Sequence, residues 1–220
     1  MLFLCRDIAA AIHRMDQYGF AKMYYVVDYG QSAHFVNLKS ILRQMNYEWA
    51  DKIEHVRFGR ISGMSTRKGT AILLEDILDE ARDRAVEAMQ STQTTKIPPE
   101  SYKQTGDILG LSAILINDFY RGRKANYEFS WERALRQTGS TAIALQYAHA
   151  RLCNLEANCG HTLDINATSN LNAISNQDAI NLMLRISAFR AVLIDSLNDV
   201  DPVHLIKYLF ALRFVYSIFD

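Results

Sequence analysis

The N-terminal part of the chain alternates between apolar positions at helical spacing and short continuous apolar runs. Three segments repeat apolar residues every three or four positions, which predicts amphipathic helices. Their apolar faces contain Ile8, Ile12 and Met15; Phe35, Leu38, Leu42 and Met45; and Leu74, Ile77, Leu78, Ala81 and Ala85. Between these faces, residues 22–27 are rich in β-branched and aromatic residues, which predicts a buried strand, and residues 53–58 are predicted to form a second strand. This order of elements is typical of a parallel α/β fold.

The rest of the chain has a different pattern, which begins after a polar segment at 91–101 that holds two of the three prolines. We predict helices there and no strand, with residues 141–156 and 181–197 each forming a continuous helix. The final helix, from residue 203, is apolar nearly all round, which predicts that it is buried. Candidate N-cap residues are Asp7, Asp107, Ser130, Ser175 and Asp201. The predicted fold class is therefore α/β followed by all-α.

Composition and charge exclude several classes of protein. The 24 basic and 24 acidic residues cancel, which argues against a dedicated nucleic-acid coat or a polybasic membrane binder. No run of about 18 apolar residues is present, so we predict no transmembrane helix and no membrane partner. Cys5, Cys153 and Cys159 do not form a disulfide or metal-binding pattern, so we expect buried free thiols and no metal site.

A basic loop follows the second predicted strand and is the first candidate for chemistry. Residues 57–69 contain four cations and no acid, and two glycines bracket the segment MSTRK. The cations are Arg57, Arg60, Arg67 and Lys68, and the bracketing glycines are Gly63 and Gly69. A cationic, glycine-flanked loop at a strand end suits a polyphosphate ligand. A solvated basic loop with no ligand is the alternative.

A second basic cluster and two histidines are weaker candidates. Basic residues at 121–124 lie beside Tyr120 and Tyr127, a mixture that can bind RNA through phosphate contacts and base stacking. A charged turn between helices is the alternative interpretation of the same residues. His34 and His149 lie beside other polar residues, which points to a site or to an interdomain contact.

Several ordered stretches give the sequence a family resemblance. The loop GMSTRKG with the following LLEDILDEAR resembles the signature loop of arginyl-tRNA synthetases, which are class I synthetases. Further blocks in the same order are LFLCRDIAAAIHR (2–14), YYVVDYGQSAHF (24–35), NYEWADKIEHVRFG (46–59), YEFSWERAL (127–135) and LQYAHARL (145–152). The resemblance covers essentially the whole chain, and the MSTRKG form looks most like mitochondrial and fungal members.

The resemblance implies an architecture and an activity. Residues 1–138 are expected to be the C-terminal part of a Rossmann-type catalytic domain, and residues 139–220 part of a helical-bundle anticodon-binding domain. The family activates arginine with ATP to form arginyl-adenylate, and then transfers the arginyl group to tRNA. The implied ligands are L-arginine, tRNA-Arg and ATP with Mg²⁺. We expect a monomer in the mitochondrial matrix, with the cytoplasm as the alternative.

Site residues carry over from the family only where the motifs match. The residues expected to bind arginine are Phe3, Asp7, Gln31 and His34. Phe3 stands where the family usually has tyrosine, so one hydroxyl is missing, and Cys5 stands where threonine is common. The expected ATP loop consists of Gly63, Met64, Ser65, Thr66 and Gly69, with Arg67 and Lys68 as its catalytic cations. Gly63 and Thr66 replace the two lysines of the class I Lys-Met-Ser-Lys-Ser loop.

One family motif has no counterpart in this sequence. No segment matches the class I His-Ile-Gly-His motif. Dense apolar and charged residues also begin within the first seven positions, and the last helix extends almost to the final residue. We therefore expect a chain that begins and ends within domains and is by itself a poor catalyst. The alternative function is a non-catalytic tRNA-binding or protein-interaction module on the same scaffold.

Overall fold

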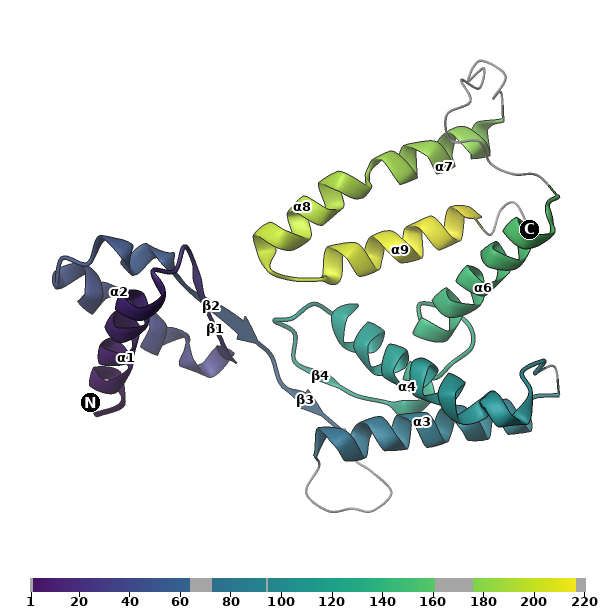
Figure 1. Cartoon of the computed structure of the whole chain (residues 1–220), viewed down its shortest axis with the longest axis horizontal. Coiled ribbons are helices and arrows are strands. Elements are labelled where there is room, and N and C mark those ends of the chain that lie inside the picture. Colours follow the sequence, from purple (N-terminus) through teal and green to yellow (C-terminus); the bar gives the residue numbers. More distant parts are fainter. Residues whose placement is uncertain (1, 64–72, 94, 161–175, 217–220) are drawn as a thin grey trace. The chain divides into compact units, whose positions relative to one another are not determined.

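The structure is a computed structural model that describes residues 2–63, 73–93, 95–160 and 176–216 (Figure 1). The chain divides into two compact units. The first contains residues 1–62 and 123–127, and the second contains residues 63–122 and 128–220. The first unit holds two helices with a parallel strand pair, and the second is mainly helical, as the α/β and all-α patterns predict.

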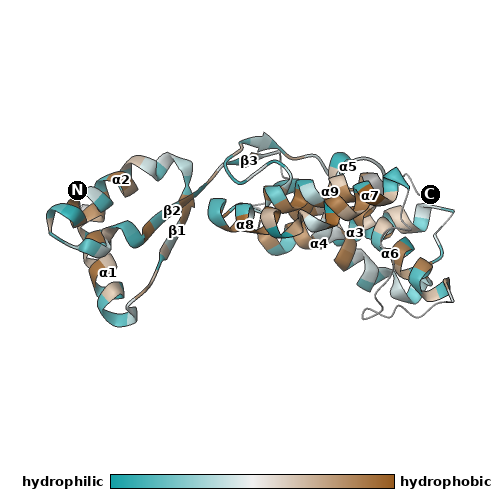
Figure 2. Cartoon of the chain, turned by 90° about the horizontal axis from the view of Figure 1, so that it is seen from above, coloured by the Kyte–Doolittle hydropathy of each residue, from teal (hydrophilic) through white to brown (hydrophobic). Residues whose placement is uncertain are grey.

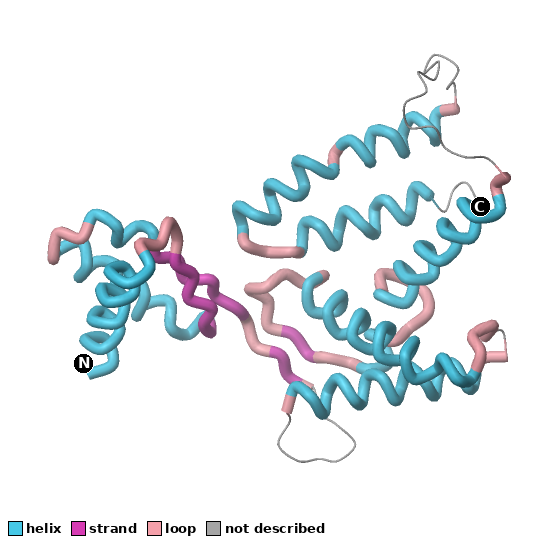
Figure 3. Tube along the Cα trace, in the orientation of Figure 1, coloured by secondary structure: helices cyan, strands magenta, loops and turns pink. Residues whose placement is uncertain are grey.

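The first unit is built around a parallel strand pair, the longer of the two magenta pairs in Figure 3. Its elements are α1 (Leu2–Tyr18), β1 (Met23–Asp28), the 3-10 turn η1 (Tyr29–Gln31), α2 (Ser32–Gln44), the 3-10 turn η2 (Glu48–Lys52) and β2 (Ile53–Phe58). The two strands pair with Met23 opposite Ile53 and Asp28 opposite Phe58. This register brings the carboxyl ends of β1 and β2 to one edge, where ligands of open parallel sheets bind.

The core of this unit lies between the two helices and one face of the strand pair. Its buried members are Ala11, Phe35, Leu38, Leu42, Ala50 and Ile53. Full burial of a leucine stabilises a fold by roughly 1.5–3 kcal/mol, so Leu38 and Leu42 hold α2 in place. The prediction that residues 22–27 form a fully buried strand is wrong, because Tyr24 is 45% exposed and Val26 is 64% exposed. Within the described residues, both helices that contribute to this core pack on one face of the pair.

The second unit contains seven helices among the described residues. They are α3 (Leu74–Ser91), α4 (Tyr102–Phe119), α5 (Trp131–Ala134), α6 (Ala142–Asn158), α7 (Gln177–Ser187), α8 (Phe189–Asp199) and α9 (Val203–Tyr216), with a 3-10 turn η3 (Pro99–Ser101). The prediction of no strand after residue 101 is wrong, since β4 (Tyr127–Glu128) pairs with β3 (Ile61–Ser62). A two-residue strand is too short to show an alternating pattern in the sequence.

Helices α3 and α4 approach each other closely at two glycines. A side chain at Gly110 would place its Cβ 2.7 Å from the Ala81 carbonyl carbon, and one at Gly106 would lie 2.6 Å from Val86 Cγ2. Ala81 and Ala113 are also buried. Small residues therefore set the separation of these two helices, because any larger side chain would push the backbones apart.

The predicted helix starts are confirmed at two positions and wrong at two others. The Ser130 side chain accepts from the Arg133 N–H at the start of α5, and Asp201 accepts from the Val203 N–H at the start of α9. Asp7 and Asp107 are instead interior residues of α1 and α4. Helix α4 begins earlier than predicted because η3, which starts at a proline, leads directly into it.

The helices near the C-terminal part of the chain also differ from the prediction in detail. Ser175 lies outside the described residues, and Asn176 caps α7 by accepting from the N–H groups of Asp178 and Ala179. The predicted continuous helix at 181–197 is two helices, which meet at Ala188. The Thr141 side chain caps α6 by accepting from the Ala144 N–H, and the helix extends to Asn158.

Two further predictions of burial, for the cysteines and for the final helix, are wrong. All three cysteines are exposed, because Cys5 lies on an uncovered face of α1 and the other two lie in and after the exposed C-terminal part of α6. Helix α9 is apolar along its length (Figure 2), yet it buries Ile206 and leaves Phe214 70% exposed. An apolar helix is fully buried only when neighbours cover all of its faces. No described helix is long and apolar enough to cross a membrane.

Candidate arginine-binding site

A carboxylate and an imidazole meet between the first two helices of the α/β unit. Nε2 of His34, in the first turn of α2, lies 2.8 Å from Oδ2 of Asp7 on α1. Asp7 is 43% exposed and His34 is 25% exposed. The fold therefore brings together two of the four residues that sequence comparison predicts for arginine binding.

The other two predicted arginine-binding residues lie on α1 and directly before α2. Phe3 precedes Asp7 by one turn of α1, so both lie along one face of that helix. Gln31 ends η1 at the carboxyl end of β1 and immediately precedes α2, as predicted for a residue at a ligand-binding strand end. Phe3 is 74% exposed and Gln31 is also exposed, so both are accessible to a ligand.

The imidazole of His34 rests on an aromatic support that the sequence analysis missed. Its ring packs edge-on against Phe35, with ring centroids 5.3 Å apart. Phe35 stacks on His55 of β2 at 4.4 Å, and His55 Nε2 donates to the Val27 carbonyl 3.1 Å away. A histidine within the predicted strand at 53–58 is the sequence signal that points to His55.

A second polar junction lies at the end of β1. Asp28 accepts from the Gly30 N–H at 2.7 Å through Oδ1, and from Arg60 Nε at 3.0 Å through Oδ2. The Arg60 guanidinium and the Gly30 N–H stabilise the carboxylate, so the pKa of Asp28 lies below its ordinary value. The same pair raises the pKa of the Arg60 guanidinium. The junction ties the turn before Gln31 to the segment that leads into the basic loop.

The basic loop is only partly within the described residues. The predicted residues Met64, Ser65, Thr66, Arg67, Lys68 and Gly69 lie outside them. Gly63 has φ +73°, a left-handed conformation that glycine adopts without strain. Of the four predicted loop cations, Arg60 is paired with Asp28, and the guanidinium of Arg57 in β2 lies 5.4 Å from the ring centroid of Tyr29. The acidic partner of Arg60 therefore comes from the end of β1 and not from the loop itself.

Residues 123–127 hold the start of this loop in place. Gly59 N–H donates to the Arg123 carbonyl at 2.9 Å, and Arg60 N–H donates to Asn126 Oδ1 at 2.7 Å. A Cβ at Gly59 would lie 2.2 Å from the Ala125 carbonyl oxygen, so a larger residue does not fit there. The Arg123 guanidinium also donates to the Arg57 carbonyl. In these contacts, residues 123–126 support the end of β2 and the start of the loop.

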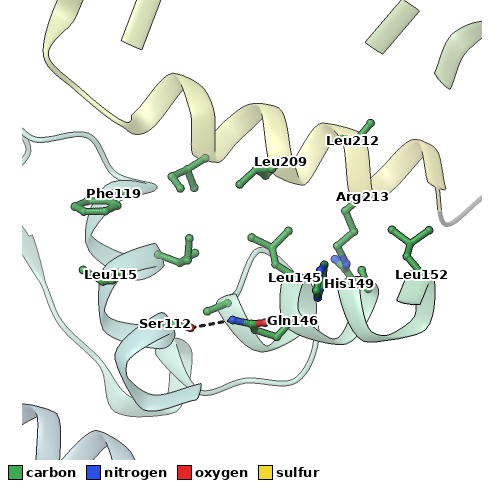
Figure 4. Close-up of a pocket in the computed structure, with 14 residues that line it drawn as sticks. Ser112, Leu115, Phe119, Leu145, Gln146, His149, Leu152, Leu209, Leu212 and Arg213 are labelled. Atoms are coloured by element: carbon green, nitrogen blue, oxygen red, sulfur yellow. Dashed lines mark hydrogen bonds between the residues drawn. The ribbon is translucent and has the colours of Figure 1, made fainter. Parts of the chain in front are cut away.

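The helical unit contains a separate apolar groove of about 530 Å³ between α4, α6 and α9 (Figure 4). Leucine side chains from all three helices point into it, and Gln146 Nε2 donates to Ser112 Oγ at 3.1 Å within it. The labelled leucines are Leu115, Leu145, Leu152, Leu209 and Leu212. His149 also lines this groove, next to Arg213. Its walls suit apolar groups.

Metal-ligand clusters do not appear in the described ranges: no group of three or more His, Cys, Asp or Glu side chains is placed to hold an ion.

Two protein families match this chain in succession. The family described as "tRNA synthetases class I (R), catalytic domain" matches residues 1–131. The family described as "DALR anticodon binding domain" matches residues 145–219. The arginine-site residues Phe3, Asp7, Gln31 and His34 all lie within the first match.

Individual relatives match over nearly the whole chain. A probable mitochondrial arginine–tRNA ligase of Mus musculus is 40% identical over 213 residues, which is 96% of this chain and 36% of the relative. A probable cytoplasmic arginine–tRNA ligase of Dictyostelium discoideum is 40% identical over 98% of this chain and 36% of its own length. The chain thus spans about a third of the length of these relatives.

A solved structure shares the fold. The arginyl-tRNA synthetase from Plasmodium falciparum superposes with a TM-score of 0.78 and 24% sequence identity. The superposition covers 97% of this chain and 36% of the other.

Proposed function

The chain belongs to the family of class I tRNA synthetase (R) catalytic domains, and on this premise we propose that it is the arginine-recognising part of an arginine–tRNA ligase. In the whole reaction, the arginine carboxylate attacks the α-phosphate of ATP, which forms arginyl-adenylate and releases pyrophosphate. The terminal adenosine of tRNA-Arg then displaces AMP and takes the arginyl group. The contact between Asp7 and His34, beside the end of the parallel strand pair, is the observation that carries this proposal.

Asp7 is the residue that selects arginine. A carboxylate can accept two N–H groups from a planar guanidinium, which gives a charge-assisted contact with defined geometry. Its partial exposure leaves room for the ligand, while Phe3 one turn earlier offers an aromatic face to the aliphatic part of the substrate. Gln31, which ends η1 and is exposed, hydrogen-bonds the polar groups of the amino acid in this proposal.

The loop at 63–69 binds the ATP phosphates. Arg67 and Lys68 supply the positive charge that stabilises the phosphates during adenylate formation, and Mg²⁺ accompanies ATP as its counter-ion. The Asp28–Arg60 pair supports this role because it anchors the start of the loop to the carboxyl end of β1, beside Gln31. Gln31 and the segment that leads into the loop are thereby linked at the end of β1.

The proposal also covers the domains of the chain, its oligomeric state and its location in the cell. Residues 1–138 form the C-terminal part of the catalytic domain, and residues 139–220 are part of the helical domain that binds tRNA-Arg. The match of residues 145–219 to the anticodon-binding family supports this division. We propose a monomer in the mitochondrial matrix, with the cytoplasm as the alternative, since relatives of both compartments share 40% identity with the chain.

Arginine binding by Asp7→Asn tests the proposal directly. The variant keeps the size of the side chain and removes its charge, so arginine affinity should fall by about tenfold or more while ATP affinity stays nearly unchanged. Both affinities are measured by calorimetric titration of the purified chain. Asp16→Asn, at an exposed position of the same helix, is the matched control. Equal losses of arginine and ATP affinity would indicate a structural role for Asp7.

A second candidate function is a non-catalytic tRNA-binding or protein-interaction module. The observation that favours it is the match of residues 145–219 to the family described as "DALR anticodon binding domain". Such a module would bind tRNA without selecting arginine over lysine. Side-by-side arginine and lysine titrations therefore separate the two candidates.

A further inference from the structure

We propose that His34 is a positioning residue, which holds the Asp7 carboxylate in the orientation that an arginine guanidinium requires. The inference rests on the proposed function, because it concerns how Asp7 selects arginine. It differs from a direct contact in that His34 acts on the substrate only through Asp7. The evidence is the geometry of the pair and the way the fold supports it.

The contact with His34 uses one oxygen of the Asp7 carboxylate and leaves the other oxygen for a ligand. His34 Nε2 lies 2.8 Å from Oδ2 of Asp7. Within the described residues, no second hydrogen bond or ion pair involves this carboxylate, and the side chain is 43% exposed. An exposed aspartate on a helix surface would otherwise rotate among its rotamers. The histidine contact fixes one orientation, so less conformational entropy is lost when a guanidinium binds.

The chemistry of imidazole suits this role. With a proton on Nε2, the imidazole donates one hydrogen bond to the Asp7 carboxylate. The ring is planar and rigid, so the position of the ring fixes the direction of this hydrogen bond. A lysine at the same position would be a flexible point charge that imposes no single orientation on the carboxylate.

The position of His34 is set by the sheet and not by the pair itself. His34 packs edge-on against Phe35, which is 5% exposed and belongs to the core. Phe35 stacks on His55, and His55 donates to the Val27 carbonyl of β1. Each contact in this series limits the movement of the next ring, which is how supporting residues keep a binding group in place.

Arginine and lysine titrations of His34 variants test the inference. His34→Leu removes the donor, and His34→Asn leaves a polar side chain that is too short to reach Asp7. His34→Gln places an amide donor near the original Nε2 position. We expect about tenfold weaker arginine binding in the Leu and Asn variants, and less than about threefold in the Gln variant. His13→Leu, at an exposed position of α1, is the control and should leave affinity unchanged.

The ratio of arginine to lysine affinity distinguishes positioning from a structural role. Bidentate binding of a guanidinium depends on carboxylate orientation, whereas a lysine ammonium is a point charge that tolerates many orientations. The Leu and Asn variants should therefore lose more affinity for arginine than for lysine. Imidazole ¹⁵N NMR gives an independent readout, because the His34 Nε2 resonance should shift in Asp7→Asn.

Each outcome has a defined meaning. Arginine binding by the wild-type chain with unchanged affinity in His34→Leu and His34→Asn would overturn the inference and leave the proposed function standing. Equal losses for arginine and lysine would also overturn it, in favour of a structural role. A wild-type chain that does not bind arginine at millimolar concentrations would overturn the proposed function, and the inference with it. Thermal unfolding of every variant, compared with His34→Gln, shows which variants are folded.

Discussion

The two units of this chain use polar and small residues in opposite ways. In the α/β unit, polar side chains from separate elements meet: Asp7 with His34, and Asp28 with Arg60. In the helical unit, glycines bring α3 and α4 together, and apolar side chains line a groove between α4 and two further helices, α6 and α9. The first arrangement brings charged side chains together, and the second serves packing. A small core is thus enough to bring polar side chains from distant parts of the chain into contact where strand ends and helix starts converge.

The largest expected effect concerns charging of tRNA by the chain alone. We expect no detectable arginyl-tRNA, although the α/β unit should still bind arginine. The sequence has no His-Ile-Gly-His segment and spans about a third of its relatives, and groups that act together in a transition state fail together. Purified chain is incubated with labelled arginine, ATP and arginine tRNA, with a complete arginine–tRNA ligase as positive control. Charging within minutes, in chain shown free of host synthetase, would contradict the prediction.

A double substitution in the basic loop should slow adenylate formation and leave tRNA binding unchanged. In the complete ligase, Arg67→Ala with Lys68→Ala should slow adenylate formation by about a hundredfold or more, since each cation stabilises charge that develops on the phosphates. Pyrophosphate exchange measures this step, and binding of tRNA by the same protein is the control. A double variant that exchanges pyrophosphate at the wild-type rate would show that the loop does not act in adenylate formation.

A substitution at the α3–α4 contact should destabilise the helical unit and leave arginine binding by the α/β unit unchanged. Gly110→Leu would drive a side chain into the Ala81 backbone and should destabilise the helical unit by about 1–3 kcal/mol or more. The free energy of unfolding is measured in urea, and arginine affinity reports on the α/β unit. Gln104→Ala, at an exposed position of α4, is the control. A loss of arginine affinity as large as the loss of stability would show that the two units do not behave separately.

The smallest effect is expected at the Asp28–Arg60 junction and depends on pH. The folded-state pKa of Asp28 lies below its ordinary value of 3.8, so ionised Asp28 stabilises the fold above that pH, and this contribution is lost as pH falls through the folded-state pKa. Asp28→Asn should therefore lower the unfolding temperature slightly at neutral pH and have no effect under strongly acidic conditions. Thermal unfolding is followed across this range, with Asp16→Asn as the control. If the difference in unfolding temperature between Asp28→Asn and the unsubstituted chain did not change with pH, the effect would be assigned to the hydrogen bond from Gly30 instead.

Much of the fold follows from local patterns in the sequence. The order of the helices and of the two longer strands up to residue 91, the caps at Ser130 and Asp201, and the change to a mainly helical pattern depend on neighbouring residues alone. Periodicity and capping are properties of a few consecutive residues, so they are visible without a structure. The candidate arginine and ATP residues came from ordered motifs, and this too required only the sequence.

Packing between distant elements decided the rest. Asp7 looks like a helix cap in the sequence, yet it lies inside α1 and meets His34, 27 residues away. Arg60 looks like a phosphate ligand, yet it pairs with Asp28, 32 residues away. Whether a side chain is buried or paired depends on what other elements place against it, and local spacing carries no information about that. For the same reason, the exposure of the cysteines and of one face of β1 appears only in the tertiary structure.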